Sequence, residues 1–394
     1  MTDSMPDPLA FRPALAHMRD QLIVEVNRIC RDHPDAISLC FGESDLPTPA
    51  VVREAAEKAI EAGKTTYADR RGIAPLRTAI QAYHHRTHGL DIDLERISAT
   101  SSGMTSIMIA LQCLVNPGDN VVVIAPVWPN VVIAVEAMDA EVRFVPLDVA
   151  DGTWTLDQDR VEALCDDRTR AIFLASPGNP TGWTMTSEQQ RSLLDLARRR
   201  GTWVIADEVY NRIVYDGSVA TPSFLEVAEP DAPLFVVQSF SKTWSMTGWR
   251  LGWLVHPAAL AKQVGNLSAI NSTGSATFVQ HAGVAAIREA EPFVTEMRNR
   301  CAFGRDLVRK AFAGQDRILA PEVPAAFYSF FKIDGVQDDL AYAKDLVARA
   351  GVGLAPGSAF GPGYEGYFRL CFAQSPDLLA KALDRLVTAL GTTG

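Results

Sequence analysis

Four short polar segments between residues 176 and 250 contain side chains whose types and spacing could carry chemistry. They are residues 176–182 (SPGNPTG), 206–210 (ADEVY), 239–242 (SFSK) and 246–250 (MTGWR). A neutral lysine amine is a nucleophile, a carboxylate in a dry site stabilises a nearby cation, and an arginine binds phosphate or carboxylate groups. These segments therefore predict nucleophilic and proton-transfer chemistry on a ligand that carries an anionic group.

Short β-branched runs precede the first three segments. Apolar runs lie at 120–124, 141–145, 170–174, 203–205, 234–237 and 251–255. Near-continuous apolar strands of this length are typical of a sheet buried on both faces. Residues 186–201 predict a helix, with a hydroxyl residue first, arginines in the last turn and a glycine as the stop. Alternating strands and helices favour a mostly parallel α/β sheet, with the polar segments gathered at one edge.

The chain is expected to fold into two domains of unequal size. A helix is expected around 13–31, after a proline-bearing arm, and an α+β pattern around 326–333 and 366–372. We predict an N-terminal arm and part of the small domain at 1–48, a large ligand-binding domain at 49–285, and a small C-terminal domain at 286–394. The predicted fold class is α/β, with a large domain of helices around a mostly parallel central sheet and a smaller α+β domain built from both chain ends.

Bulk composition excludes several classes of function. The 394 residues carry a formal net charge of −10, which argues against nucleic acid or an anionic membrane as the main partner. Six widely spaced cysteines without a CxxC pair fit neither a disulfide framework nor a zinc site. The acidic, proline-broken N-terminus is not a signal peptide, and no apolar run is long enough to span a bilayer. We expect a cytoplasmic protein.

The ordered set of four segments resembles the class I/II aminotransferases of the fold-type I pyridoxal-phosphate superfamily. The resemblance extends from residues 42–49 (GESDLPTP) to 368–370 (FRL) and so covers nearly the whole chain. It implies a fold-type I architecture with pyridoxal 5'-phosphate as cofactor. It also implies that Lys242 holds the cofactor as a Schiff base and later moves the proton at the substrate α-carbon.

Three further residues are implied to tune the cofactor. Asp207 would keep the ring nitrogen protonated, although Glu208 next door could compete and Asp207 could simply cap a helix. Tyr210 and Asn179 would hydrogen-bond the cofactor's 3-oxygen. For Asn179 the alternative is a turn former before Pro180.

The resemblance also implies a phosphate site. Its ligands would be Arg250, Ser239 and, more weakly, Ser241. The backbone amides of Gly103 and Met104 would add donors at the start of a helix, where the dipole favours anions. The hydroxyls around Gly103 could instead only cap that helix.

The resemblance implies that one residue acts at the site of a second subunit. Tyr67 resembles a tyrosine that reaches the phosphate across a subunit interface, which implies a homodimer.

Two side chains are expected above the cofactor and at the substrate. Trp128 resembles the aromatic residue that stacks on the pyridine ring, the alternative being a core tryptophan. Arg369 lies inside an apolar strand and would bind the substrate α-carboxylate beside the Gly42 backbone. The alternative for Arg369 is a structural ion pair.

The substrates are expected to be an amino acid and a 2-oxo acid. Residues 263–281, where relatives specific for dicarboxylates can supply a second arginine, contain no Lys or Arg. That favours a neutral or aromatic amino donor, unless Arg70 or Arg71 substitutes. Trp183 is bulky and could narrow the site.

Other functions were weighed against aminotransfer. The same residues could support elimination or other α-carbon chemistry. A non-catalytic module of a transcription regulator is disfavoured because the family pattern begins by about residue 37. No metal is expected: His84 and His88 have i,i+4 spacing, but their segment better fits a solvated helix face. Residues 361–366 match GxGxxG without the strand–helix context that a dinucleotide site needs.

Overall fold

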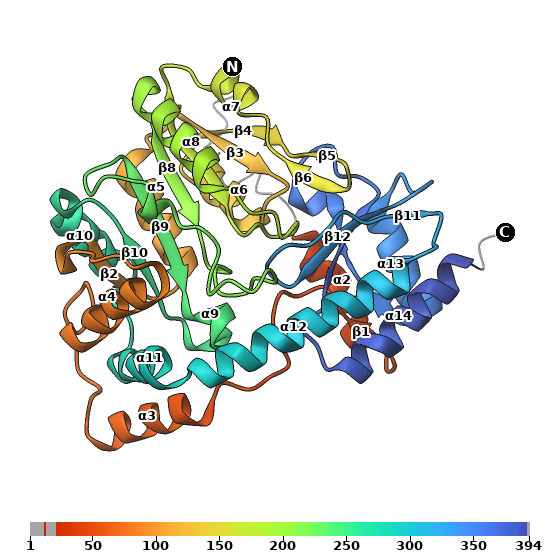
Figure 1. Ribbon diagram of the computed structural model, residues 1–394, viewed down its shortest axis with the longest axis horizontal. Helices are drawn as coiled ribbons and strands as arrows, with labels where there is room; N and C mark the ends of the chain where they lie inside the picture. The colour runs from red at the N-terminus through yellow and green to blue at the C-terminus, as the bar shows by residue number, and fades with distance from the viewer. Residues whose placement is uncertain (1–11, 13–20, 392–394) are drawn as a thin grey trace, which may run out of the picture.

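A seven-stranded sheet forms the centre of the computed structural model, which describes Arg12 and residues 21–391. The strand order is β2-β10-β9-β8-β7-β3-β4, and β10 alone runs antiparallel to its neighbours (Figure 1). The bounds are β2 (Ile97–Thr100), β3 (Asn120–Ala125), β4 (Glu141–Pro146), β7 (Thr169–Ala175), β8 (Trp203–Asp207), β9 (Leu234–Ser239) and β10 (Gly252–Val255). All six predicted strands are present, and the sheet is mostly parallel as expected.

The strand β2 was not predicted, because two of its four residues are polar. Its residues are nevertheless all buried. Ser98 is accommodated there because its hydroxyl lies 2.9 Å from Nε2 of His256, so the buried polar group has a partner.

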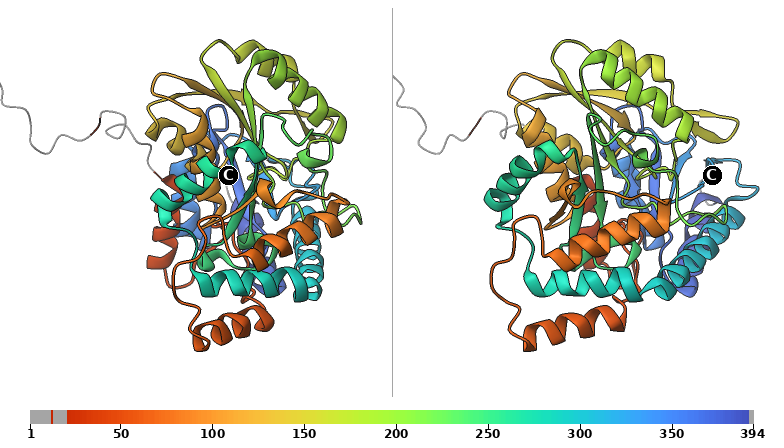
Figure 2. Two further views of the ribbon diagram at one scale, coloured as in Figure 1. Left: turned by 90° about the vertical axis from the view of Figure 1, so that its left-hand side faces the viewer. Right: turned by 60° about the vertical axis from the view of Figure 1, so that its left-hand side comes forward.

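Helices cover both faces of the large sheet (Figures 1 and 2). The predicted helix at 186–201 is confirmed as α8 (Ser187–Arg200), with Thr186 and Gln189 forming a capping box and Gly201 ending it at φ 64°. The other helices of the large sheet are α3 (Ala50–Glu61), α4 (Ala74–His88), α5 (Gly103–Leu114), α6 (Pro129–Ala137), α7 (Gln158–Leu164), α9 (Phe240–Thr243), α10 (Ala261–Ser272) and α11 (Thr277–Glu289). Helices α3 and α11 pack against each other at the lower end of the molecule as drawn in Figure 2.

A smaller sheet lies beside the large one, with the order β11-β12-β15-β14. Its strands are β11 (Ile318–Leu319), β12 (Tyr328–Ile333), β14 (Ala355–Pro356) and β15 (Tyr367–Cys371). A separate hairpin of β5 (Asp148–Ala150) and β6 (Thr153–Thr155) packs against this sheet through Trp154, whose ring lies 6.0 Å from that of Phe330. Helices α12 (Glu291–Phe312), α13 (Asp339–Ala350) and α14 (Pro376–Gly391) accompany the small sheet (Figure 1). The α+β pattern expected for this part of the chain matches these elements.

The two ends of the described chain meet in this region. Strand β1 (Ile37–Ser38) pairs in parallel with β13 (Val352–Gly353), and α2 (Leu22–Asp32) packs against α13. The helix expected at 13–31 thus corresponds to α2 in its second half, and residues 13–20 lie outside the described residues. The domain boundaries at 48 and 285 stay a prediction.

The histidines of α4 are not a solvated face throughout. His84 is fully buried and its Nε2 accepts a hydrogen bond of 3.1 Å from Nε1 of Trp253, so the expectation was wrong for this residue. This side of the helix packs against the core, where Tyr83 and Trp253 surround the His84 ring.

Within residues 21–391, no group of His, Cys, Asp and Glu side chains is placed to hold a metal ion. In the same range no helix is long and apolar enough to cross a bilayer.

Candidate active site

A cavity of about 470 Å³ lies at the ends of the central strands, between the large sheet and the small one. Every predicted site residue except Tyr67 lines it: Gly42, Gly103, Met104, Trp128, Asn179, Asp207, Tyr210, Ser239, Ser241, Lys242, Arg250 and Arg369. These side chains meet because the parallel strands β7, β8 and β9 end at one edge, while Gly42 and Arg369 come from the chain segments around the small sheet.

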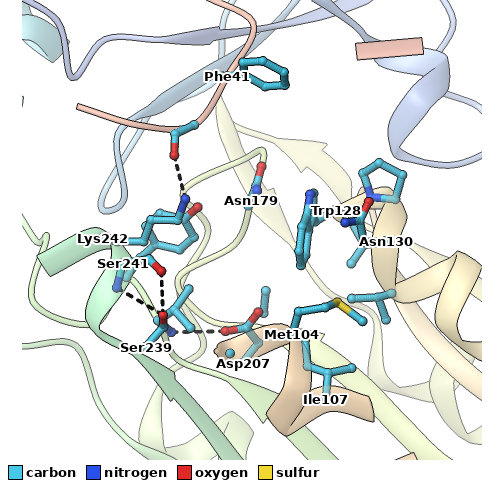
Figure 3. A pocket seen from close by; sticks show the side chains of 18 of the residues that line it. Phe41, Met104, Ile107, Trp128, Asn130, Asn179, Asp207, Ser239, Ser241 and Lys242 are labelled. Atoms are coloured by element: carbon cyan, nitrogen blue, oxygen red, sulfur yellow. Dashed lines mark hydrogen bonds between the residues drawn. The ribbon is translucent and has the colours of Figure 1, made fainter. Parts of the chain in front are cut away.

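The lysine amine is held at the roof of this cavity. Lys242 follows β9 in the short helix α9, and its Nζ donates to the carbonyl oxygen of Gly42 at 2.6 Å (Figure 3). Burial lowers the pKa of Lys242 to about 8, and the nearby charge of Arg369 acts in the same direction. A substantial fraction of the amine is therefore neutral, and so nucleophilic, near physiological pH.

A buried carboxylate lines the cavity below Lys242 as drawn in Figure 3. Asp207 is the last residue of β8, and its Oδ1 accepts from the backbone N–H of Val209 at 3.2 Å (Figure 3). Burial raises the pKa of Asp207 to about 6. No cation of the described chain pairs with it directly, so the carboxylate is suited to a cationic atom of a ligand.

The neighbouring carboxylate does not compete for this position. Glu208 is fully buried outside the cavity, where it accepts from Ser223 Oγ at 2.7 Å and from the backbone N–H of Phe224 at 2.9 Å. Successive residues of a strand point to opposite faces, which explains why the two acids separate.

Donors for an anion gather below Lys242. Ser239 Oγ accepts from the backbone N–H of Ser241 at 3.1 Å and donates to its Oγ at 2.9 Å (Figure 3). The N-terminus of the twelve-residue α5 begins at Gly103, where an added Cβ would lie 3.4 Å from Cβ of Ser239. Arg250 lines the same part of the cavity from a left-handed backbone conformation, φ 53°. Hydroxyls, a helix N-terminus and a guanidinium are groups that favour an anion such as a phosphate.

Arg369 is buried at the far end of the cavity. Its Nη1 donates to Oδ1 of Asn179 at 2.8 Å and its Nη2 donates to the carbonyl of Cys40, while Nε has no partner among the described residues. The guanidinium carbon lies 4.6 Å from the ring centre of Tyr328. Because no carboxylate of the described chain pairs with Arg369, the structural ion pair is not formed and the cation is free to bind one from a ligand.

An aromatic side chain faces the lysine across the cavity. Trp128 directly precedes α6, is only partly buried and stands opposite Lys242 (Figure 3). It is therefore not enclosed in the core. Phe41, Asn130 and Ile107 line the same region and were not predicted (Figure 3).

Four residues singled out in the sequence do not line the cavity. Tyr67 is 89% exposed and outside the cavity of its own chain, so its predicted role toward a second subunit stays a prediction. Arg70 contacts Asn266, Arg71 pairs with Glu95 at 2.8 Å, and neither lines the cavity. Trp183 is buried outside the cavity and does not narrow it.

Tyr328 lines the cavity from β12 and was not predicted. Its hydroxyl lies 2.6 Å from that of Tyr210. A phenol inside the apolar run 327–331 was the available signal, because a buried tyrosine hydroxyl needs a polar partner.

Comparison with known proteins agrees with this fold. Residues 34–386 match the family described as aminotransferase class I and II. Aspartate aminotransferase of Pyrococcus horikoshii is 32% identical over 90% of this chain and 91% of its own length. The arginine–pyruvate transaminase AruH of Pseudomonas aeruginosa is 34% identical over 89% of each. The solved structure of Thermus thermophilus aspartate aminotransferase with maleate has a TM-score of 0.89 at 30% identity, covering 96% of this chain and 99% of that one.

The chain belongs to the aminotransferase class I and II family. The predicted family, enzyme class and fold class are confirmed.

Proposed function

We propose that this enzyme moves the amino group of an L-amino acid to a 2-oxo acid, with pyridoxal 5'-phosphate held covalently at Lys242. The observation that carries the proposal is the composition of one cavity. Three side chains line this cavity together. They are Lys242, whose amine is partly neutral, Asp207, a buried carboxylate without a cation, and Arg369, a buried guanidinium without a carboxylate.

The residues fit the proposed cofactor group by group. A phosphate matches the α5 N-terminus with Ser239, Ser241 and Arg250, which all line the cavity. A protonated ring nitrogen matches Asp207, whose buried charge lacks a counter-ion within the described chain. Trp128 offers a flat apolar face for the ring.

Asn179 and Tyr210 both have hydrogen-bond donors available for the 3-oxygen of the proposed cofactor. Asn179 already accepts from Arg369 through Oδ1, so its amide N–H groups remain available as donors. Tyr210 brings a second donor, since burial raises the pKa of its phenol well above the usual value and keeps it protonated.

The chemistry divides between the ligand and the chain. Pyridoxal phosphate supplies a conjugated pyridinium that accepts the electron pair released at the substrate α-carbon. Asp207 keeps that ring nitrogen protonated, and Arg369 fixes the substrate through its carboxylate. Lys242 Nζ takes the proton from the α-carbon, a role for which its pKa of about 8 is suited because general bases work best near the operating pH.

The amino donor is proposed to be neutral or aromatic. Of the cations lining the cavity, Arg369 is assigned to the α-carboxylate, Arg250 to phosphate and Lys242 to the chemistry, so none remains for a second carboxylate. Phe41 and apolar residues from α2 are among the other lining residues. The relatives act on donors as different as aspartate and arginine by their names, so they do not select one. We further propose a cytoplasmic homodimer in which Tyr67 reaches the neighbouring site.

Borohydride trapping tests the proposal. Reduction of the cofactor-loaded enzyme followed by peptide mapping should place the label on Lys242. The Lys242→Ala variant should carry none. The control Lys310→Ala, at an exposed lysine of α12, should label normally. A label on any other lysine would overturn the assignment.

Dependence on an acceptor separates transfer from elimination. An aminotransferase should convert only one equivalent of amino acid per site without a 2-oxo acid and turn over once the acid is added. Continuous ammonia release without an acceptor would instead identify an elimination enzyme.

A further inference from the structure

A second tyrosine stands behind the tyrosine of the site. Tyr328 comes from β12 of the small sheet and Tyr210 follows β8 of the large one, and their hydroxyl oxygens are 2.6 Å apart. Both rings are buried, at 0% and 3% exposure, so water does not compete for this contact. The two phenols therefore form a hydrogen bond within a dry part of the cavity wall.

The direction of that bond follows from the donor count. A phenol has one proton to donate and can accept further hydrogen bonds. The only hydrogen-bond partner of the Tyr328 hydroxyl in the described chain is Tyr210. When Tyr210 turns its proton toward a ligand oxygen, Tyr328 must be the donor in the pair. Burial raises the pKa of both phenols, so both protons are present throughout the physiological range.

Packing holds Tyr328 in this position. Its hydroxyl lies under Gly42, where an added Cβ would stand 1.8 Å from the phenol oxygen, so only a glycine fits there. The guanidinium of Arg369 lies over the Tyr328 ring at 4.6 Å. A cation beside the ring favours release of the phenol proton and makes it a stronger donor.

We propose that Tyr328 is a positioning residue that donates a hydrogen bond to Tyr210 and so strengthens the hydrogen bond from Tyr210 to the 3-oxygen of the cofactor. This inference rests on the proposed function. Hydrogen bonds in a chain polarise one another, and the effect is largest where the local dielectric is low. Through its ring contact with Arg369, Tyr328 also links the arginine assigned to substrate with the phenol assigned to cofactor.

The test is the pH midpoint of the cofactor's visible absorption band in the loaded enzyme. A donor on the 3-oxygen stabilises the form that has lost the proton shared near that oxygen, so it lowers the midpoint. Tyr328→Phe keeps the ring beside Arg369 and removes only the hydroxyl. It should raise the midpoint by about half a pH unit. Tyr210→Phe should raise it further, because it removes the direct donor.

A matched control and a double variant separate the outcomes. Tyr364→Phe removes another buried phenol, which donates to the carbonyl of Ala125 at 2.8 Å outside the cavity, and should leave the midpoint unchanged. In a Tyr210→Phe background, Tyr328→Phe should have no further effect, because the relay is already broken.

Each other result has a defined meaning. An unshifted midpoint in Tyr328→Phe, with a shift in Tyr210→Phe, would overturn the relay and leave the proposed function standing. An equal shift from Tyr328→Phe in both backgrounds would also overturn the relay. No shift in Tyr210→Phe would mean that Tyr210 does not reach the cofactor, and the proposed site itself would fail.

Discussion

Arg369 donates a hydrogen bond of 2.8 Å to Asn179, which joins the residue assigned to the substrate with one assigned to the cofactor. The two come from different sheets, since Arg369 lies in β15 and Asn179 follows β7. Because the bond occupies the Asn179 oxygen, it also fixes which way the amide points. The packing of the two sheets around the cavity therefore orients the side chains of Arg369 and Asn179 together.

Arg369→Lys should weaken substrate binding while leaving the cofactor in place. Lysine keeps the charge but loses the planar pair of donors, so kcat/KM for the amino acid should fall about 10- to 100-fold, mainly through KM. Steady-state kinetics with a series of amino acids measures this. Arg349→Lys, at a surface arginine paired with Asp345, is the control and should behave as the parent. An unchanged KM would exclude Arg369 as the carboxylate site.

Asp207→Asn should impair catalysis far more than the same change at the next residue. Removing the charge beside the ring nitrogen should lower kcat by about 10³-fold and weaken cofactor binding. Glu208→Gln removes an equally buried charge outside the cavity, held by Ser223 and Phe224. That variant should lose stability to urea but keep the cofactor's spectrum. Equal losses of kcat in the two variants would contradict the assignment.

Attachment of pyridoxal phosphate to the cofactor-free enzyme should depend on pH through Lys242. Only the neutral amine attacks the aldehyde. The pKa of Lys242 is about 8 in the folded enzyme, against an unperturbed value of 10.5. The attachment rate should therefore rise about tenfold per pH unit below 8 and level off above it. Stopped-flow absorbance at several pH values measures the midpoint. A midpoint near 10.5 would mean that the amine is not desolvated.

The same pKa shift makes the stability of the fold depend on pH. The folded enzyme releases the Lys242 proton at lower pH than the unfolded chain does, so the unfolded chain binds more protons between pH 8 and 10.5. The contribution of Lys242 to stability therefore rises with pH across this window. In urea unfolding of the cofactor-free enzyme, Lys242→Met should remove that part of the pH dependence, and Lys310→Met should not.

Thr186→Ala should lower stability without touching the chemistry. The Thr186 hydroxyl accepts from the backbone N–H of Gln189 and the Gln189 side chain accepts from that of Thr186, and losing such a cap costs about 1 kcal/mol. Urea unfolding and kcat measured together check both parts. Ser187→Ala, one residue on and outside the capping box, should leave the unfolding midpoint nearly unchanged.

Much of this site could be predicted from the sequence because a polar residue at the end of an apolar run shows where a strand ends. Asp207 and Lys242 each close or follow an apolar run, and parallel strands bring such positions to one edge. The antiparallel direction of β10 could not be read, because an apolar run has no orientation. Tyr328 was missed because its partner Tyr210 is distant in sequence and belongs to the other sheet. Trp183 was misplaced because a bulky residue beside a motif gives no sign of the face it occupies.

The parallel pairing of β1 with β13 has a consequence for how the enzyme is made. Ile37 and its partner Val352 are far apart in the sequence, so Ile37 is synthesised well before its partner exists. The segment at 40–42, which accepts from both Arg369 and Lys242, therefore cannot adopt its final position until β13 and β15 have been synthesised. A ribosome-bound chain stopped before β13 should thus hold a formed central sheet and an amine still open to water.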